Sequence, residues 1–212
     1  MSSHTPARTT PDGLDGSPLT LEQIERLIQD RFSGVACNLQ HGELTVFASS
    51  SNLLDVLAFC RDDDQLACDY LADLSGVHWP AGDRVIERQT STTGWPEFRV
   101  SRQRGVIEVL YVLRSTYRNH WLRVSVGVDD QEPALPSATG LWETANFHER
   151  EVYDFFGVTF VGHPNLVRIL MPDGWVGHPH RKDYPLGGVE IPYKHDKFIP
   201  SPEHRELREV VE

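Results

Sequence analysis

The chain has 212 residues, of which 39% are hydrophobic and 24% charged, a composition that is ordinary for one globular domain with extensions. An excess of Asp and Glu gives it a formal net charge of -11, which disfavours nucleic acid and anionic lipid surfaces as partners. No apolar run approaches the ~18 residues that a membrane span needs, and the N-terminus lacks the layout of a secretory signal. The expected location is therefore the cytoplasm.

The first quarter of the chain predicts a leader, a helix and a hairpin. Residues 1–18 consist mainly of Ser, Thr, Pro, Gly and Asp and are expected to form a disordered leader. Thr20 and Gln23 have the spacing of a capping box, which predicts that an amphipathic helix begins there. Two β-prone runs, Val35–Leu39 and Glu43–Phe47, then flank a His-Gly turn and predict a hairpin.

The next hundred residues predict one more helix and three strands. Ser50 or Ser51 is expected to begin a helix that continues through Cys60. Segments rich in β-branched and aromatic residues predict strands at Tyr70–Val77, Gly105–Leu113 and Trp121–Val128. The polar stretch Gly82–Gly94 is interpreted as a loop. The last two strands are expected to be antiparallel neighbours in a sheet.

The three cysteines do not form a metal-binding pattern. They are odd in number and widely spaced, without the C-x-x-C pair that zinc or iron–sulfur sites use. Buried reduced thiols are therefore expected at Cys37, Cys60 and Cys68.

A third helix is predicted from about Thr139 to Phe156, ending at Gly157, a residue suited to the left-handed end position. Steps of three and four place five side chains on one face: Trp142, Ala145, Glu149, Val152 and Phe156. Glu149 thus interrupts an apolar stripe, where a carboxylate needs a compensating partner. The alternatives are solvent, a cation from another chain, or a strand arginine: Arg99, Arg102 or Arg123.

Other charged residues of this helix allow two interpretations. Arg150 and Asp154 lie four positions apart and are expected to pair along the helix surface. That pairing leaves Glu149 and Glu151 without a local cation. A general-acid role for Glu149, Glu151 or Asp154 is a second interpretation, which requires a cleft and a raised pKa.

The last quarter of the chain is interrupted by proline. Short strands are predicted at Val158–Phe160 and Val167–Leu170, but half of the 14 prolines fall beyond residue 160. Proline removes a backbone donor and restricts the residue before it, so this region cannot continue a sheet or helix. The prediction is an α+β domain over residues 19–170 and an extended arm over 171–212. The arm either wraps its own domain or lies on partner subunits.

A cluster of histidines and charges lies within the predicted arm. His178, His180 and Asp183 suggest a metal site, but the spacing lacks a regular ligand pattern. The second interpretation is that Arg181, Lys182 and Asp183 form charge-assisted hydrogen bonds that lock the arm in place.

Several blocks of sequence resemble one protein family. They are Glu149–Val158, His163–Leu166, Arg168–Leu170, Pro172–Trp175 and Gly177–Leu186, with a further similar stretch at Asp69–Val77. Together they resemble the C subunit of NADH-quinone oxidoreductase, respiratory complex I, which is the thirty-kilodalton subunit family. The resemblance implies a single domain with a mixed, largely antiparallel sheet flanked by helices, plus an irregular C-terminal arm.

The resemblance also implies a role without catalysis. The protein would lie in the peripheral arm of the proton-translocating enzyme, on the cytoplasmic side of the cell membrane. It would contact the quinone-site (D) subunit and the iron–sulfur (B and I) subunits, while NADH, FMN, iron–sulfur clusters and quinone are bound elsewhere. No catalytic, cofactor-binding or metal residue is expected, and eight residues are predicted to be structural or interfacial: Glu149, Arg150, Glu151, Asp154, His178, Arg181, Asp183 and Tyr184.

Two alternatives remain. The first is a homologous subunit of a membrane-bound hydrogenase or a ferredoxin-quinone reductase, which nicotinamide-oxidising partners would distinguish. The second is a metal-dependent hydrolase that uses His178, His180 and Asp183. Because the chain stops at Glu212, a separate subunit is expected rather than a fusion with the quinone-site subunit.

Overall fold

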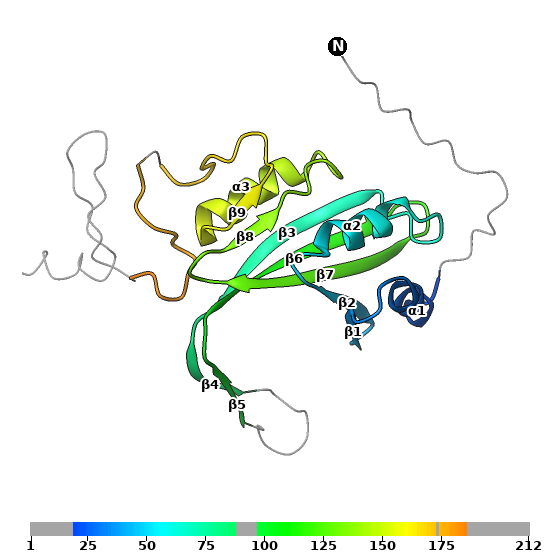
Figure 1. Ribbon diagram of the computed structural model, residues 1–212, viewed down its shortest axis with the longest axis horizontal. Coiled ribbons are helices and arrows are strands. Elements are labelled where there is room, and N and C mark those ends of the chain that lie inside the picture. The colour runs from blue at the N-terminus through cyan, green and yellow to red at the C-terminus, as the bar shows by residue number, and fades with distance from the viewer. Residues whose placement is uncertain (1–18, 88–96, 173, 186–212) are drawn as a thin grey trace, which may run out of the picture.

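The computed structural model describes residues 19–87, 97–172 and 174–185, and its centre is a five-stranded sheet (Figure 1). The strands of this sheet are β1 (Ala36–Gln40), β2 (Glu43–Ala48), β3 (Tyr70–Trp79), β6 (Val106–Ser115) and β7 (His120–Asp129). They lie in the order β1-β2-β7-β6-β3, and β2–β7 is the parallel pair among antiparallel ones. The prediction of an α+β domain with a mixed, largely antiparallel sheet is confirmed.

Three helices contribute to one core against this sheet. They are α1 (Leu21–Arg31), α2 (Leu53–Asp62) and α3 (Ala145–Phe156). Along β6 every second side chain is buried, as expected for a strand with one face against helices. The helices and the inner face of the sheet share a single cluster of buried apolar side chains, and α3 lies on β3. Among the described residues no helix combines the length and apolarity that crossing a bilayer requires.

Local sequence signals set several element boundaries correctly. The Thr20 hydroxyl accepts the Gln23 N–H, and the Gln23 side chain accepts the Thr20 N–H at 2.8 Å, so the predicted capping box forms. Gly157 ends α3 with φ +78°, the predicted left-handed conformation. The predicted hairpin, second helix and two long neighbouring strands are also present. Cys60 and Cys68 are buried free thiols, as predicted, whereas Cys37 is half-buried.

The structure corrects the prediction of a loop at Gly82–Gly94. Residues Gly82–Glu87 form strand β4, which pairs with β5 (Glu97–Arg102), while residues 88–94 lie outside the described part. The two strands form a separate ribbon that projects from the body (Figure 1). A ribbon outside the main sheet does not need the alternating apolar pattern on which the prediction relied.

Two predictions around α3 are also wrong. Residues 139–144 form turns, and α3 begins only at Ala145, because the Ser137 and Thr139 hydroxyls bond locally and compete with helix. Val167–Leu170 is not a strand. The strand predicted at Val158–Phe160 lies within one residue of β9 (Thr159–Val161). Its parallel partner β8 (Ala134–Pro136) was missed, because it is three residues long and contains a proline.

Candidate functional site

Asp154 organises the chain that follows α3. Its carboxylate is fully buried, and Oδ2 accepts the successive backbone N–H groups of Ile169, Leu170 and Met171 at 2.8–3.0 Å. Oδ1 accepts Arg168 Nη1 at 2.7 Å. Burial acts to raise the pKa of Asp154, but the three N–H groups and the guanidinium outweigh it and hold the pKa below its ordinary value. The ionised carboxylate therefore fixes this turn of backbone.

The predicted surface pair between Arg150 and Asp154 is absent. Arg150 instead donates to the carbonyls of Val167 at 3.0 Å and Arg168 at 3.3 Å. The physical reason is that Asp154 points into the protein, where fixed backbone donors and Arg168 satisfy both of its oxygens. Arg150 and Asp154 thus hold the same loop from two sides.

The carbonyl groups that end α3 are capped by the downstream chain. Arg168 Nη1 donates to the Asp154 carbonyl at 3.1 Å, and His178 Nδ1 lies 3.0 Å from the same oxygen. A carbonyl only accepts, so Nδ1 of His178 carries a proton. The His180 N–H donates to the Phe155 carbonyl at 3.2 Å, and the two rings stack with centroids 3.9 Å apart. These contacts satisfy carbonyls that have no partner within the helix and fasten the arm to α3.

Gly157 permits this close approach, and a substitution there tests it. A Cβ at Gly157 would lie 2.6 Å from the His178 ring, on a backbone already at φ +78°. Gly157→Ala is expected to destabilise the chain by about 2–3 kcal/mol, from left-handed strain plus displacement of His178. Gly162→Ala is the matched control, because its φ is +89° and no heavy atom would contact the added Cβ within 4 Å. Equal losses for both variants in urea unfolding would show that the His178 contact contributes nothing.

Glu149 is fully buried in the stripe that the sequence predicted, yet its partners are different. Oε2 accepts the Ser137 hydroxyl at 2.7 Å, and Oε1 accepts the Ala138 N–H at 2.6 Å. Neither donor is charged. Burial therefore outweighs the two hydrogen bonds and raises the pKa of Glu149 to about 7. Glu149 ties the segment before α3 to the helix.

Two of the predicted alternatives for Glu149, a pair with Arg123 and exposure to solvent, are wrong. Arg123 pairs with Glu43 across β2 and β7, and Glu149 does not reach solvent. The other two candidates, Arg99 and Arg102, have side chains outside the described part. Arg123 is therefore not the partner of Glu149, which bonds instead to donors eleven and twelve residues earlier, at Ala138 and Ser137.

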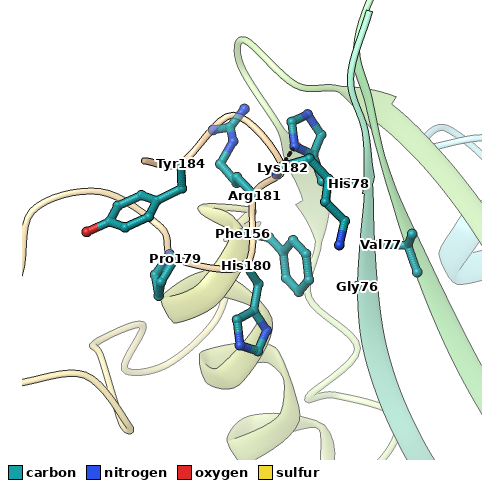
Figure 2. Close-up of a pocket in the computed structure, with 9 residues that line it drawn as sticks. All are labelled: Gly76, Val77, His78, Phe156, Pro179, His180, Arg181, Lys182 and Tyr184. Atoms are coloured by element: carbon teal, nitrogen blue, oxygen red, sulfur yellow. Dashed lines mark hydrogen bonds between the residues drawn. The ribbon is translucent and has the colours of Figure 1, made fainter. Parts of the chain in front are cut away.

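The arm is joined to the end of the sheet by a polar cluster around His78. Nε2 of this buried histidine lies 3.1 Å from Asp130 Oδ2, and Nδ1 lies 2.9 Å from the Lys182 backbone nitrogen and 3.6 Å from Asp183 Oδ1. Arg181 donates to the Asp130 carbonyl and lies 3.7 Å from Asp183. Figure 2 shows His78 hydrogen-bonded to Lys182 of the arm, and both residues belong to the lining of one cavity. Of the three residues predicted to lock the arm, Arg181 forms a charge-assisted hydrogen bond, Lys182 bonds through its backbone, and Asp183 lies close to His78 and Arg181 beyond hydrogen-bond distance.

The eight predicted residues divide into two groups and an outlier. Glu149, Arg150, Asp154 and His178 belong to α3 and its cap, whereas Arg181, Asp183 and Tyr184 belong to the arm. Tyr184 donates to the Val176 carbonyl at 3.4 Å and packs against Gly177. Glu151 is exposed, away from both groups. His178 and His180 contact different atoms of α3, and in the described ranges no three His, Cys, Asp or Glu side chains gather as metal ligands.

Sequence reasoning missed three residues that the structure makes central. Arg168 lay inside an apolar run, and a charged residue there was a signal for a buried pair. His78 occupies an inward position of β3, two residues beyond Gly76 and four beyond Leu74, so strand alternation pointed to a buried histidine. Asp130 follows β7 directly and gave no such signal.

The loop that Asp154 holds at residues 169–171, and Arg168 at the Gly177 carbonyl, is described at residues 166–172 and 174–177 and exposes apolar side chains. Its exposed apolar side chains are those of Val167, Ile169, Leu170 and Val176, and 84% of the surface of Val176 is accessible to solvent. Backbone fixed by a buried ion pair and three N–H bonds does not need these residues for its own core. An α+β module that holds a rigid apolar loop and an arm next to one helix has the features of a protein–protein interaction domain.

Comparison with known families agrees with this class. Residues 46–190 match the family model described as "Respiratory-chain NADH dehydrogenase, 30 Kd subunit". The chain belongs to this family, and the resemblance found in the sequence is confirmed.

Individual relatives share most of the chain. The C subunit of NADH-quinone oxidoreductase from Acidothermus cellulolyticus is 42% identical over 79% of this chain and 77% of its own. The protein of the same name from Mycolicibacterium gilvum is 38% identical over 90% of this chain and 70% of its own. A solved structure described as the trypsin-resistant fragment (1-134) of Nqo5 is 27% identical, with a TM-score of 0.50, and covers 70% of this chain and 100% of that fragment.

Proposed function

We propose that the chain is the C subunit of a proton-translocating NADH-quinone oxidoreductase and acts as a structural part of its peripheral arm on the cytoplasmic side of the cell membrane. It supports electron transfer from NADH through flavin and iron–sulfur clusters to quinone, but it performs no chemical step. Membership of the thirty-kilodalton family supports the assignment to this enzyme. The names of its relatives support the choice of this particular component.

The two buried carboxylates of α3 bond to groups of the chain itself, and this supports a role without catalysis. The ionised Asp154 is occupied by four donors from the following loop, and Glu149 is occupied by Ser137 and Ala138. A general acid must reach a substrate, and these two carboxylates are buried against the chain's own backbone. We propose that FMN, the clusters, NADH and quinone are bound by other subunits.

One observation carries the proposal: rigid backbone displays exposed apolar side chains. A preformed loop loses little conformational entropy on binding, so its apolar contacts contribute more fully to affinity. We assign this loop, with the arm, to the contacts with the quinone-site (D) subunit and the iron–sulfur (B and I) subunits. Arm residues 177–184 contact their own domain or one another, whereas the predicted continuation of the arm over residues 186–212 lies outside the described part.

The proposal predicts that the loop's apolar residues matter for assembly and little for folding. Leu170→Ser combined with Val176→Ser should change the free energy of unfolding by no more than about 1 kcal/mol, because both side chains are exposed, at 57% and 84%. Recovery of the other subunits with the affinity-tagged chain should fall at least tenfold, together with NADH-quinone reductase activity of the membranes.

Tyr117→Ser is the matched control, since Tyr117 is 60% exposed in the turn between β6 and β7, outside the loop. It should leave recovery of the complex unchanged. Recovery of the double variant at the level of the control would contradict the assignment of the loop to the interface.

The same purification separates the rival enzymes. Recovery of nicotinamide-oxidising subunits supports NADH-quinone oxidoreductase. Recovery of hydrogenase or ferredoxin-oxidising partners in their place would instead assign the chain to one of those related complexes.

A further inference from the structure

The His78 cluster defines its own protonation state. Nδ1 accepts a hydrogen bond from the Lys182 backbone N–H at 2.9 Å, so it must present a lone pair. Nε2 then carries the ring proton and donates it to Asp130 Oδ2 at 3.1 Å. The structure therefore holds a neutral imidazole with a single tautomer.

A second acceptor lies beside the same nitrogen. Asp183 Oδ1 is 3.6 Å from Nδ1, beyond hydrogen-bond distance but close enough to pair after a small shift. A proton on Nδ1 would place two donors, N–H of the ring and N–H of Lys182, against each other. It would also offer the Asp183 carboxylate a charged hydrogen-bond donor.

We propose that His78 is a proton-operated latch for the C-terminal arm. The neutral ring holds the arm through the Lys182 backbone, and the protonated ring releases that N–H and pairs with Asp183 while keeping Asp130. A neutral imidazole accepts a hydrogen bond at one ring nitrogen and an imidazolium donates at both, so the ring offers the arm two bonding patterns. This inference concerns the chain alone and does not depend on which partner the arm contacts.

Some charged groups near His78 favour its protonated form, and others favour its neutral form. Asp130, which follows β7, and Asp183 of the arm would stabilise an imidazolium, whereas Arg181 of the arm opposes it. From α3, the neutral Phe156 lines the same cavity, as do His180 and the side chain of Lys182 from the arm. Arg181 is largely buried and bonds to the Asp130 carbonyl, whereas the side chain of Lys182 is exposed.

The surroundings give the arm room to move on one side only. A cavity of about 490 Å³ is lined by β3, by Phe156 and by arm residues that include Pro179 and Arg181 (Figure 2). On the other side Asp130 is fixed: a Cβ at Gly105 would lie 1.7 Å from its Oδ2, and Gln131 donates to its Oδ1 at 2.9 Å. A change at Nδ1 is therefore expected to displace the arm rather than the sheet.

The test follows the Lys182 amide of the full chain by 15N-resolved NMR from pH 8 to pH 5. Its exchange protection, after correction for the intrinsic rate, should fall at least tenfold through one titration shared with the His78 ring signals. His78→Gln removes the titrating ring and should abolish the pH dependence. A Lys182 amide whose protection stays constant over this range in the natural chain would overturn the proposal.

Asp183→Asn provides a second variant that keeps the fold, because the Asp183 side chain is 60% exposed. The neutral latch should persist at pH 8, while the midpoint of the Lys182 titration should fall by about half a pH unit, the size expected for an exposed pair. An unchanged midpoint would show that Asp183 does not catch the protonated ring and would overturn the two-position latch.

Discussion

Replacing Asp154 by Asn is expected to lower the free energy of unfolding by about 3 kcal/mol and to prevent incorporation of the chain into its complex. The variant leaves Arg168, whose side chain is only 19% exposed, without its ion-pair partner. It also weakens the acceptor for three backbone N–H groups. Removing one partner of a buried charged network costs about 3–5 kcal/mol, and partial exposure of Arg168 places the loss at the lower end.

The pH dependence of this loss identifies its source. The pKa of Asp154 is lower in the folded chain than in the unfolded chain, so the carboxylate contributes stability above its ordinary pKa. That contribution disappears as pH falls through the folded-state value. The difference between the natural chain and Asp154→Asn in urea unfolding should therefore shrink with acidification. Glu151→Gln on the exposed side of α3 is the control and should have little effect at any pH.

Glu149 is expected to give the opposite pH dependence. Its pKa is raised from 4.5 to about 7, so the folded chain keeps a proton that the unfolded chain releases. Stability contributed by this protonated carboxyl is complete below pH 4.5, decreases as pH rises, and is lost above about 7. The total is about 3 kcal/mol, from about 1.4 kcal/mol for each pKa unit.

Two variants isolate the Glu149 effect from other titrating groups. Glu149→Gln keeps a neutral side chain of the same shape, so its stability relative to the natural chain should rise from near zero at pH 4 to about 3 kcal/mol at pH 8. Glu149→Leu should instead cost about 2–3 kcal/mol at pH 4, because it leaves the Ala138 N–H and the Ser137 hydroxyl without their acceptor. If urea unfolding shows no pH-dependent gain in the free energy of unfolding for Glu149→Gln, the buried charge of Glu149 is not the cause of the pH dependence.

Short-range features of the fold were predictable from the sequence. The Thr20 capping box and the end of α3 at Gly157 each depend only on residues a few positions apart, so the local sequence is enough to predict them. Burial of Glu149 was also predictable, because helical spacing places it within an apolar stripe. The family resemblance rested on longer blocks of sequence, most of them in α3 and in the chain that follows it.

The partners of the buried charges were not predictable in this way. Asp154 has a cation four residues earlier, yet it pairs with Arg168, fourteen residues later. The ion-pair partner of Asp154 depends on which side of α3 packs against the domain and on where the loop after the helix lies in the folded chain. His78 and Lys182 lie 104 positions apart, a contact that only the assembled sheet and arm create.

The parallel pairing of β2 with β7 has a consequence for folding during synthesis. Thr45 and Arg123 are neighbours in this pair although 78 positions separate them along the chain. The β1–β2 hairpin leaves the ribosome early, but one edge of β2 has no strand to join until β7 has been made. Contacts of such long range form slowly, so this half-finished sheet edge is the stage at which the nascent chain is most open to wrong pairing.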